Sequence, residues 1–364
     1  MIAALAGLLL ALQPAPPPPD DALPLPPEPA ALPLPPEPPA STEPASTAPP
    51  PSGDEASRVV RGTPVAAGGS PWQIQLYTVL QINQEILKAD RDLPPTDKRK
   101  RFYEKMADWE RNHLCGGALI GDGWALTAAH CLVELDDRLS WSLRDIRVRL
   151  GNVRLPAATQ MAIDRVVVHG DYRRSGNKRH DIALLHLVPD AATDHAIAAR
   201  AQAIPLAAPG SVALAPNVDV VATGWGITGE NVRGSTRDIR DAPLRGSADL
   251  LEGQLKLVSA ADCSRISAYR KIIWPGVVCA VGADERRQDT CQGDSGGPLT
   301  RLNQLVGLVS TGEGCGRKDV PAIYTRVDVY ADWIRLAMQQ SPPGTTSRCR
   351  VNGQGAAARL ACTR

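Results

Sequence analysis

From Val59 onward, short apolar runs alternate with breaks that contain Gly or Pro. The runs are rich in β-branched residues, which is typical of strands separated by turns. A series of short strands of this kind predicts an all-β barrel or sandwich. The clearest predicted strands are Trp72–Val79, Ile146–Leu150, Ile163–Val168, Val218–Ala222 and Leu305–Val309.

One regular helix is predicted near the end of this region. Apolar residues recur at helical spacing through Val327–Gln339, among them Tyr330 and Ile334. The chain should therefore combine many short strands with a single clear C-terminal helix.

Residues 81–112 interrupt the strand pattern. They hold 15 charged residues, four of them in the run Lys98–Arg101. Two groups of apolar residues are spaced so that each could line one helix face: Ile82, Ile86 and Leu87, then Phe102, Met106 and Trp109. We expect a charged, partly helical insertion between two strands, divided at Pro94-Pro95.

Residues 1–58 cannot build a packed core. The first twelve residues are apolar and about as long as the core of a signal peptide, so we expect residues 1–13 to be one, although no basic residue precedes them. The alternative is a short disordered tail. Between Pro14 and Pro51 lie 18 of the 33 prolines, and an eight-residue unit that begins at Ala22 recurs from Ala31. Proline lacks the amide donor and favours extended polyproline II, so residues 14–58 are expected to form a spacer-like acidic prosegment.

The net charge of +1 is distributed unevenly along the chain. Residues 1–58 carry seven acidic residues and one Arg, a net charge of −6, so residues 59–364 carry +7. The balanced total gives no reason to expect nucleic acid as a partner. No run of 18 apolar residues occurs, so we expect no integral membrane segment.

Three segments carry residues suited to nucleophilic catalysis. They are Leu126–Cys131 (LTAAHC), His180–Leu185 (HDIALL) and Cys291–Pro298 (CQGDSGGP). Each His or Asp alone could be structural, but His, Asp and Ser in these settings and in this order form a highly specific signal. On these motifs the chain resembles the chymotrypsin-like (trypsin-like) serine protease family from about Val59 to Gln340, outside the insertion.

The resemblance implies two packed six-stranded antiparallel β-barrels with a C-terminal helix and an active site in the cleft between them. It implies a catalytic triad of His130, Asp181 and Ser295, in which His130 is the base that a weakly nucleophilic serine needs. Asp181 would orient the imidazole, and the backbone amides of Gly293 and Ser295 would form the oxyanion hole. The other histidines lack metal-ligand spacing and are expected to be surface or strand residues: His113, His169, His180, His186 and His195.

The resemblance also supplies a primary substrate pocket, with Asp289 at its base and a wall formed by Ser310, Gly312 and Ala322. A buried carboxylate favours a cationic partner, so we expect cleavage after Arg or Lys. Ala322 replaces the Gly usual in trypsin-like members and should narrow the pocket, and Thr311 replaces the usual Trp. The preference between Arg and Lys therefore stays open, and an exposed acidic loop is the alternative for Asp289.

The stretch Arg58–Gly62 resembles the activation junction of the family, with Arg61 in place of the usual Gly. Cleavage after Arg58 would free the amine of Val59, which in the family pairs with the Asp before the nucleophile, here Asp294. An unpartnered buried carboxylate is costly, so the uncut chain is expected to be an inactive zymogen. Because Arg58 suits the predicted pocket, either another protease or the chain itself could cut there.

Eight cysteines allow complete pairing. The resemblance pairs Cys115 with Cys131, Cys263 with Cys279, and Cys291 with Cys315, which leaves Cys349 and Cys362 to close a loop in the extension 342–364. Four disulfides predict an oxidising compartment, hence a secreted or periplasmic protein. No Cys-x-x-Cys occurs and Asn152–Gln160 carries no carboxylate for calcium, so we expect no metal and no other cofactor.

The sequence thus predicts a secreted serine endopeptidase, a hydrolase made as a zymogen, with its protease domain over residues 59–341. We expect a monomer that acts on proteins or peptides. The run Lys98–Arg101 is expected to be a self-nicking site or a surface for an acidic partner. The alternatives are a non-catalytic binding protein on the same fold, a protease with non-basic specificity, and a Pro-rich anchor that carries the protease as cargo.

Overall fold

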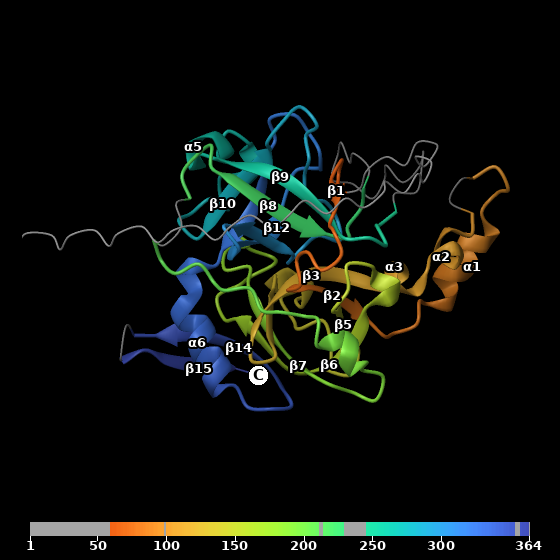
Figure 1. Cartoon of the computed structure of the whole chain (residues 1–364), viewed down its shortest axis with the longest axis horizontal. Helices are drawn as coiled ribbons and strands as arrows, with labels where there is room; N and C mark the ends of the chain where they lie inside the picture. Colours follow the sequence, from red (N-terminus) through yellow and green to blue (C-terminus); the bar gives the residue numbers. More distant parts are fainter. Residues whose placement is uncertain (1–58, 98–99, 211–213, 229–244, 354–356, 364) are drawn as a thin grey trace, which may run out of the picture. The chain divides into compact units, whose positions relative to one another are not determined.

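The computed structural model describes residues 59–97, 100–210, 214–228, 245–353 and 357–363. The predicted signal peptide, the Pro-rich prosegment, Arg58, Lys98 and Arg99 lie outside these ranges. The described chain is built mainly of strands, arranged in two sheets (Figure 1).

The first sheet contains a closed barrel. Its six strands are β2 (Gln73–Thr78), β3 (His113–Gly121), β4 (Trp124–Thr127), β5 (Ile146–Leu150), β6 (Thr159–His169) and β7 (Ala183–Val188). Neighbouring strands are antiparallel, and β6 pairs with both β5 and β7, which closes the ring. In β5 every second side chain is buried, because a strand directs alternate residues to the barrel core.

The second sheet repeats this arrangement. Its barrel strands are β8 (Asp219–Gly224), β9 (Leu251–Val258), β10 (Val277–Gly282), β11 (Pro298–Arg301), β12 (Gln304–Thr311) and β13 (Ala322–Arg326). Strand β8 pairs with both β11 and β9 and closes the barrel, and the short β1 (Thr63–Pro64) adds to β9. The predicted fold of two six-stranded antiparallel barrels is confirmed, and each of the five predicted strands falls on an observed one.

The predicted C-terminal helix is α6 (Ala331–Gln340), preceded by the 3₁₀ turn Asp328–Tyr330. Trp333 and Ile334 of α6 are buried in a cluster that draws side chains from both barrels. Beyond α6, the extension forms a hairpin of β14 (Thr345–Asn352) and β15 (Arg359–Thr363), which was not predicted. Strand β14 pairs in parallel with β6. Two other short helices, α4 (His195–Ala198) and α5 (Ala260–Cys263), lie in connections.

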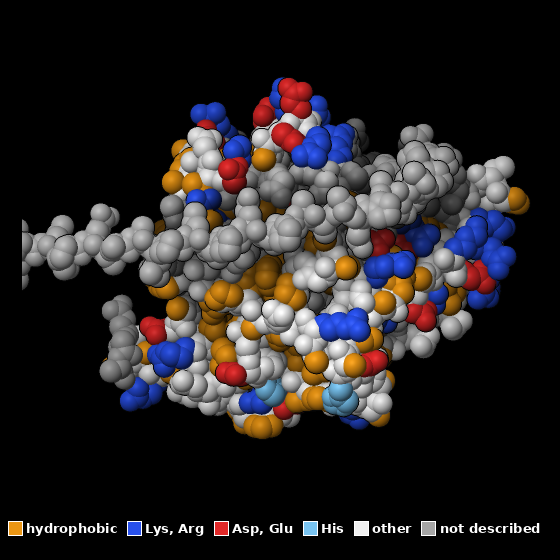
Figure 2. Space-filling view, in the orientation of Figure 1, with side chains coloured by type: hydrophobic (Ala, Val, Ile, Leu, Met, Phe, Trp, Pro, Cys, Tyr) orange, Lys and Arg blue, Asp and Glu red, His pale blue; other side chains and the backbone are white. Residues whose placement is uncertain are grey.

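The insertion is partly helical, but its second half differs from the prediction. α1 (Gln84–Asp92) ends before the two prolines, whereas Phe102, Met106 and Trp109 do not share one helix. They lie instead on α2 (Phe102–Lys105), the extended Met106, and α3 (Asp108–Arg111). The buried carboxylate of Asp90 in α1 accepts the amides of Phe102 and Tyr103, which fixes where α2 begins. Charged side chains gather over α1 and α2 (Figure 2).

The pairing of all eight cysteines is confirmed: Cys115 with Cys131, Cys263 with Cys279, Cys291 with Cys315, and Cys349 with Cys362. Cys115 and Cys131 join β3 to the turn after β4, and Cys349 and Cys362 join the two strands of the terminal hairpin.

Candidate active site

The first barrel brings His130 and Asp181 together. His130 lies in the 3₁₀ turn Ala129–Cys131 after β4, and Asp181 lies two residues before β7. His130 Nδ1 is 2.8 Å from Asp181 Oδ2, and the backbone amide of His130 donates to Asp181 Oδ1 over 2.8 Å. Because an ionised carboxylate can only accept, Nδ1 carries the proton, and Nε2 is the nitrogen left to receive one.

Ser310 gives Asp181 a further donor. Ser310 Oγ on β12 donates to Asp181 Oδ2 over 2.6 Å, although the sequence placed Ser310 only at the pocket wall. Burial alone would raise the pKa of Asp181, but the charge of His130 and the hydrogen bonds from His130 and Ser310 hold it below its ordinary value. Asp181 is therefore ionised at neutral pH and stabilises a positive charge on the imidazole.

The second barrel brings the backbone of Ser295 beside the turn that carries His130. The amide of Gly116 on β3 donates to Ser295 O over 2.8 Å, and Cys131 Sγ lies 4.0 Å from the same oxygen. Gly293 and Gly296 on either side have φ values of 95° and 75°, a backbone conformation that favours glycine. Across the described chain, the amides of Gly293 and Ser295 donate no hydrogen bond, so both can serve an oxyanion.

His113 supports the oxyanion loop, a role that the sequence did not indicate. His113 Nε2 is 2.6 Å from the carbonyl oxygen of Gly293, and its Nδ1 is 2.7 Å from Nε2 of the buried Gln75. Burial lowers the pKa of His113, so the ring is neutral, donates from Nε2 and accepts at Nδ1. Gln75 Nε2 also donates to the carbonyl of Trp109 over 2.7 Å, which ties the insertion to the same network.

A cavity of about 180 Å³ opens beside Ser295. Ser310, Thr311 and Gly312 form part of its wall, together with Ala322. A Cβ placed on Gly312 would lie 3.8 Å from Cβ of Ala322, so the Ala322 methyl faces Gly312 across the cavity. The narrowing expected from Ala322 stays a prediction.

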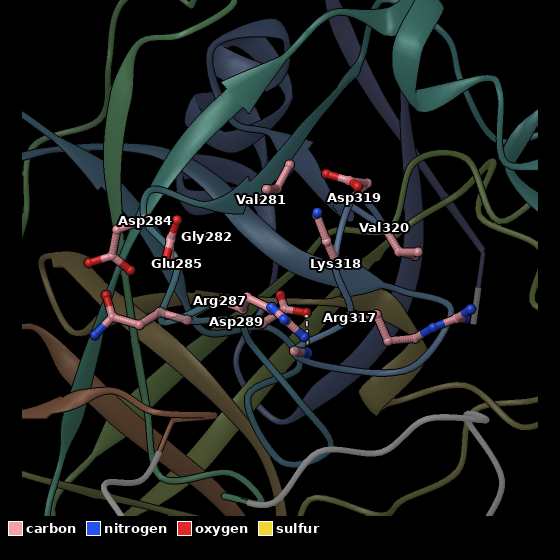
Figure 3. A pocket seen from close by; sticks show the side chains of 12 residues that line it. Val281, Gly282, Asp284, Glu285, Arg287, Asp289, Arg317, Lys318, Asp319 and Val320 are labelled. Carbon is pink, nitrogen blue, oxygen red and sulfur yellow. Dashed lines mark hydrogen bonds between the residues drawn. The ribbon is translucent and has the colours of Figure 1, made fainter.

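Asp289 lines a neighbouring cavity of about 390 Å³ (Figure 3). Asp289 lines this cavity and not the one beside Ser295, which its neighbour Thr290 lines. Its carboxylate accepts the amides of Thr290 and Gly316 over 2.8 and 2.9 Å. Burial raises the pKa of Asp289 to about 7 against these hydrogen bonds. Within the described ranges, no Lys or Arg forms an ion pair with it.

Asp294 is a second buried carboxylate. Its oxygens accept the amides of Gly226 and Cys291, each over 2.8 Å, and burial raises its pKa to about 6. As with Asp289, no described Lys or Arg pairs with it. Val59 is fully buried, and its neighbour Val60 forms a backbone bridge with Asp289 and packs against the disulfide of Cys291.

Comparison with known proteins decides the family. Residues 95–334 match the family model described as Trypsin, which is more than half of the chain. The chain belongs to the trypsin family of serine proteases.

Curated relatives of this trypsin-family chain include transmembrane protease serine 11C of mouse, 33% identical over 61% of the chain, and human transmembrane protease serine 11B, 32% identical over 64%. The chain covers 47% and 51% of these two proteins, so it spans about half their length. Among solved structures it is similar to mouse neuropsin, a serine protease expressed in the limbic system of the brain, with a TM-score of 0.54 and 26% identity. That similarity covers 76% of the chain and 98% of neuropsin.

The remaining histidines of this trypsin-family chain lie apart from the Ser295 cavity. His169 ends β6 and stacks on His180 with ring centroids 4.6 Å apart, against Trp333. His186 lies on β7 beside Asp164, and His195 is exposed at the start of α4. Among the described residues, only Cys115, His130 and Cys131 are grouped closely enough to ligate a metal ion. The two cysteines form a disulfide with each other and cannot act as thiolate ligands.

Replacing His113 by Ala is expected to lower kcat about tenfold with little change in KM, because the Gly293 carbonyl loses the donor that fixes the backbone between the two proposed oxyanion amides. Steady-state hydrolysis of a short peptide measures this. His195→Ala, at an exposed position, is the matched control and should retain wild-type kcat. Equal kcat values for the two variants would show that His113 does not support the oxyanion loop.

Proposed function

We propose that this chain is a secreted serine endopeptidase that cleaves after Arg or Lys and is made as a zymogen activated by cleavage after Arg58. Family membership supports peptide-bond hydrolysis as the reaction. The specificity, the activation and the location are the parts that require experiment.

The proposed mechanism uses the groups around Ser295. Ser295 Oγ attacks the carbonyl carbon of the scissile bond while Nε2 of His130 accepts the hydroxyl proton. The charged imidazole that results is stabilised by Asp181, which already receives Nδ1–H. The oxyanion is bound by the amides of Gly293 and Ser295, and His130 then gives its proton to the leaving amine, so that an acyl-enzyme forms. Water, activated by His130, hydrolyses this ester.

The observation that carries the proposed specificity is the buried carboxylate of Asp289, which has no ion-pair partner among the described residues and directly precedes Thr290 of the Ser295 cavity. A carboxylate whose burial raises its pKa to about 7 gains a strong interaction when a cation arrives, since ion pairing restores the charged form. A substrate Arg or Lys side chain is long enough to place such a cation at the end of a narrow cavity. The neutral cavity walls at Ser310 and Gly312 suit the methylenes of that side chain.

The buried carboxylate of Asp294 supports activation at the predicted junction. It has no cationic partner among the described residues, and Val59, the residue after the predicted cut, is itself buried. A free amine on Val59 would supply the missing charge. Secretion is supported by the four disulfides, which form in oxidising compartments. None of the helices described is both long and apolar enough to span a membrane.

A panel of fluorogenic peptides that differ only at the residue before the cut tests the specificity. We expect hydrolysis after Arg and Lys to dominate, and Asp289→Ser to lower kcat/KM for these peptides by about 10³-fold or more, because a substrate cation would then be buried without a partner. Hydrolysis of Phe or Leu peptides by Asp289→Ser should be unchanged or faster, which controls for folding. Faster wild-type cleavage after Phe or Leu than after Arg and Lys would overturn the assignment.

A further inference from the structure

The C-terminal hairpin completes the edge of a barrel strand that leads into the active site. β5 pairs with β6 only over Thr159–Ala162. Beyond that point β14 takes the same edge of β6 and pairs in parallel with it, up to Cys349 beside His169. The hairpin therefore holds the end of β6 from which residues 170–180 run directly to Asp181.

Backbone contacts fasten the hairpin at this position. The carbonyl of the buried Cys349 accepts the amide of Gly170 over 2.7 Å and the indole N–H of Trp333 over 2.8 Å. A Cβ on Gly170 would lie 3.1 Å from the Cys349 carbonyl carbon, so the two backbones are in close contact. The disulfide to Cys362 keeps β15 on the outer side of β14.

Arg348 on β14 joins two loops that are distant in the sequence. Its Nη1 donates to the carbonyl of Tyr172 over 3.1 Å, and its Nη2 donates to the carbonyl of Asp137. Tyr172 belongs to the loop before Asp181, whereas Asp137 belongs to the loop after His130. A guanidinium suits this task because its planar fork can serve two acceptors at once.

The loop at Asp137 is connected in turn to the catalytic histidine. The Asp137 carboxylate accepts the backbone amide of Arg174 over 2.5 Å, and it also bonds the side chain of Ser175. Arg174 Nη1 donates to the carbonyl of His130 over 2.7 Å and to that of Val133 over 2.5 Å. A continuous set of hydrogen bonds thus runs from Arg348 through Asp137 and Arg174 to His130.

We propose that Arg348 is a positioning residue of the active site, which holds the loops of His130 and Asp181 at the separation that their hydrogen bond requires. The C-terminal hairpin then contributes to catalysis through the geometry of these two residues. The inference rests on the proposed catalytic function of these two residues. Arg348 touches neither of them, so its effect should fall on their geometry and not on substrate binding.

Activity and spectroscopy of Arg348→Ala test this inference. We expect kcat of the activated enzyme on an Arg peptide to fall about tenfold with KM within twofold of wild type, since small displacements of catalytic groups cost rate rather than affinity. The downfield proton resonance of the His130–Asp181 hydrogen bond should shift or broaden. The matched control is Arg350→Ala, also on β14, whose guanidinium is half exposed and 3.7 Å from Asp171. Such a surface pair contributes little, so kcat should stay within twofold.

Two further variants keep the test decisive. Arg348→Lys keeps the charge but lacks the planar fork whose two nitrogens reach the two carbonyls, so it should give an intermediate kcat, and it replaces Arg348→Ala if that variant does not fold. Combining Arg348→Ala with Arg174→Ala should cost little more than the larger single loss, because both act in one network. A lowered melting temperature with unchanged kcat and an unchanged resonance would overturn the proposal. The resonance needs no substrate, so it separates failure of this inference from failure of the proposed function.

Discussion

Replacing Ser295 by Ala is expected to lower kcat for Arg and Lys peptides by on the order of 10⁵–10⁶-fold, the largest effect of any single change in this chain. The physical reason is that no other group near His130 can form the acyl-enzyme, while the oxyanion amides and the cavity remain. The residual rate should exceed that of the uncatalysed reaction only by the small factor that substrate binding and the oxyanion hole give without a nucleophile. Hydrolysis of a fluorogenic Arg peptide by the chain cleaved after Arg58 measures it.

The same variant separates two routes of activation. KM or an inhibitor constant should be close to that of wild type, because Asp289 and the cavity walls are intact. If purified Ser295→Ala protein acquires a Val59 N-terminus as fast as wild type in isolation, the chain does not activate itself. Wild-type activity in Ser295→Ala would exclude serine catalysis at this site and would favour another assignment of the nucleophile.

Cleavage after Arg58 is expected to raise kcat/KM for Arg peptides by at least about 10³-fold, and Asp294→Asn is expected to remove this gain. The Val59 amine is the proposed cation for Asp294, and an ion pair at a buried carboxylate is strongly stabilising relative to the unpaired charge. The measurement compares wild type and Asp294→Asn before and after cutting by an added protease. Equal activity of cut and uncut wild type would contradict the zymogen.

Stability against pH tests the same residue in the uncut chain. The pKa of Asp294 is about 6 in the folded protein against an ordinary value of 3.8, so the folded state holds its proton more tightly. The contribution of the Asp294 carboxyl to the free energy of unfolding is therefore fully present below about pH 4. It is lost as the pH rises through about 6, where the folded protein gives up this proton. The ionised carboxylate costs about 2–3 kcal/mol at pH 7.5, so the melting temperature should fall by several degrees between pH 4 and 7.5, and Asp294→Asn should remove this fall.

All variants for this measurement also carry Ser295→Ala, which prevents self-cleavage during heating. Asp289, whose pKa is about 7, should cause a similar loss of folding stability at somewhat higher pH. Asp289→Asn is therefore the matched comparison. After cleavage Asp294→Asn should lower the melting temperature at pH 7.5, because the variant then loses the proposed ion pair. A melting temperature that is independent of pH between 4 and 8 would show that neither carboxylate is buried as described.

The sequence by itself determined the fold class and the chemistry of the site. In β5 and β9 alternate residues face a barrel core, and this period of two is written locally in the chain. The motifs around His130, Asp181 and Ser295 are likewise contiguous, so each is visible without knowledge of its partners. The cysteine pairs followed from the family resemblance rather than from spacing.

Tertiary structure alone decided which distant residues support the site. His113 and Gly293 are 180 residues apart, and Ser310 and Asp181 are 129 apart, so closure of the two barrels brings each pair together. The start of α2 depends on Asp90, which accepts the first amides of α2 from another helix. The hairpin at Arg348 depends on the edge of β6 that β5 leaves open. The pattern of apolar and polar residues within a segment indicates which of its faces is buried. Hydrogen bonds between distant segments depend on backbone positions that are set only when the whole chain has folded.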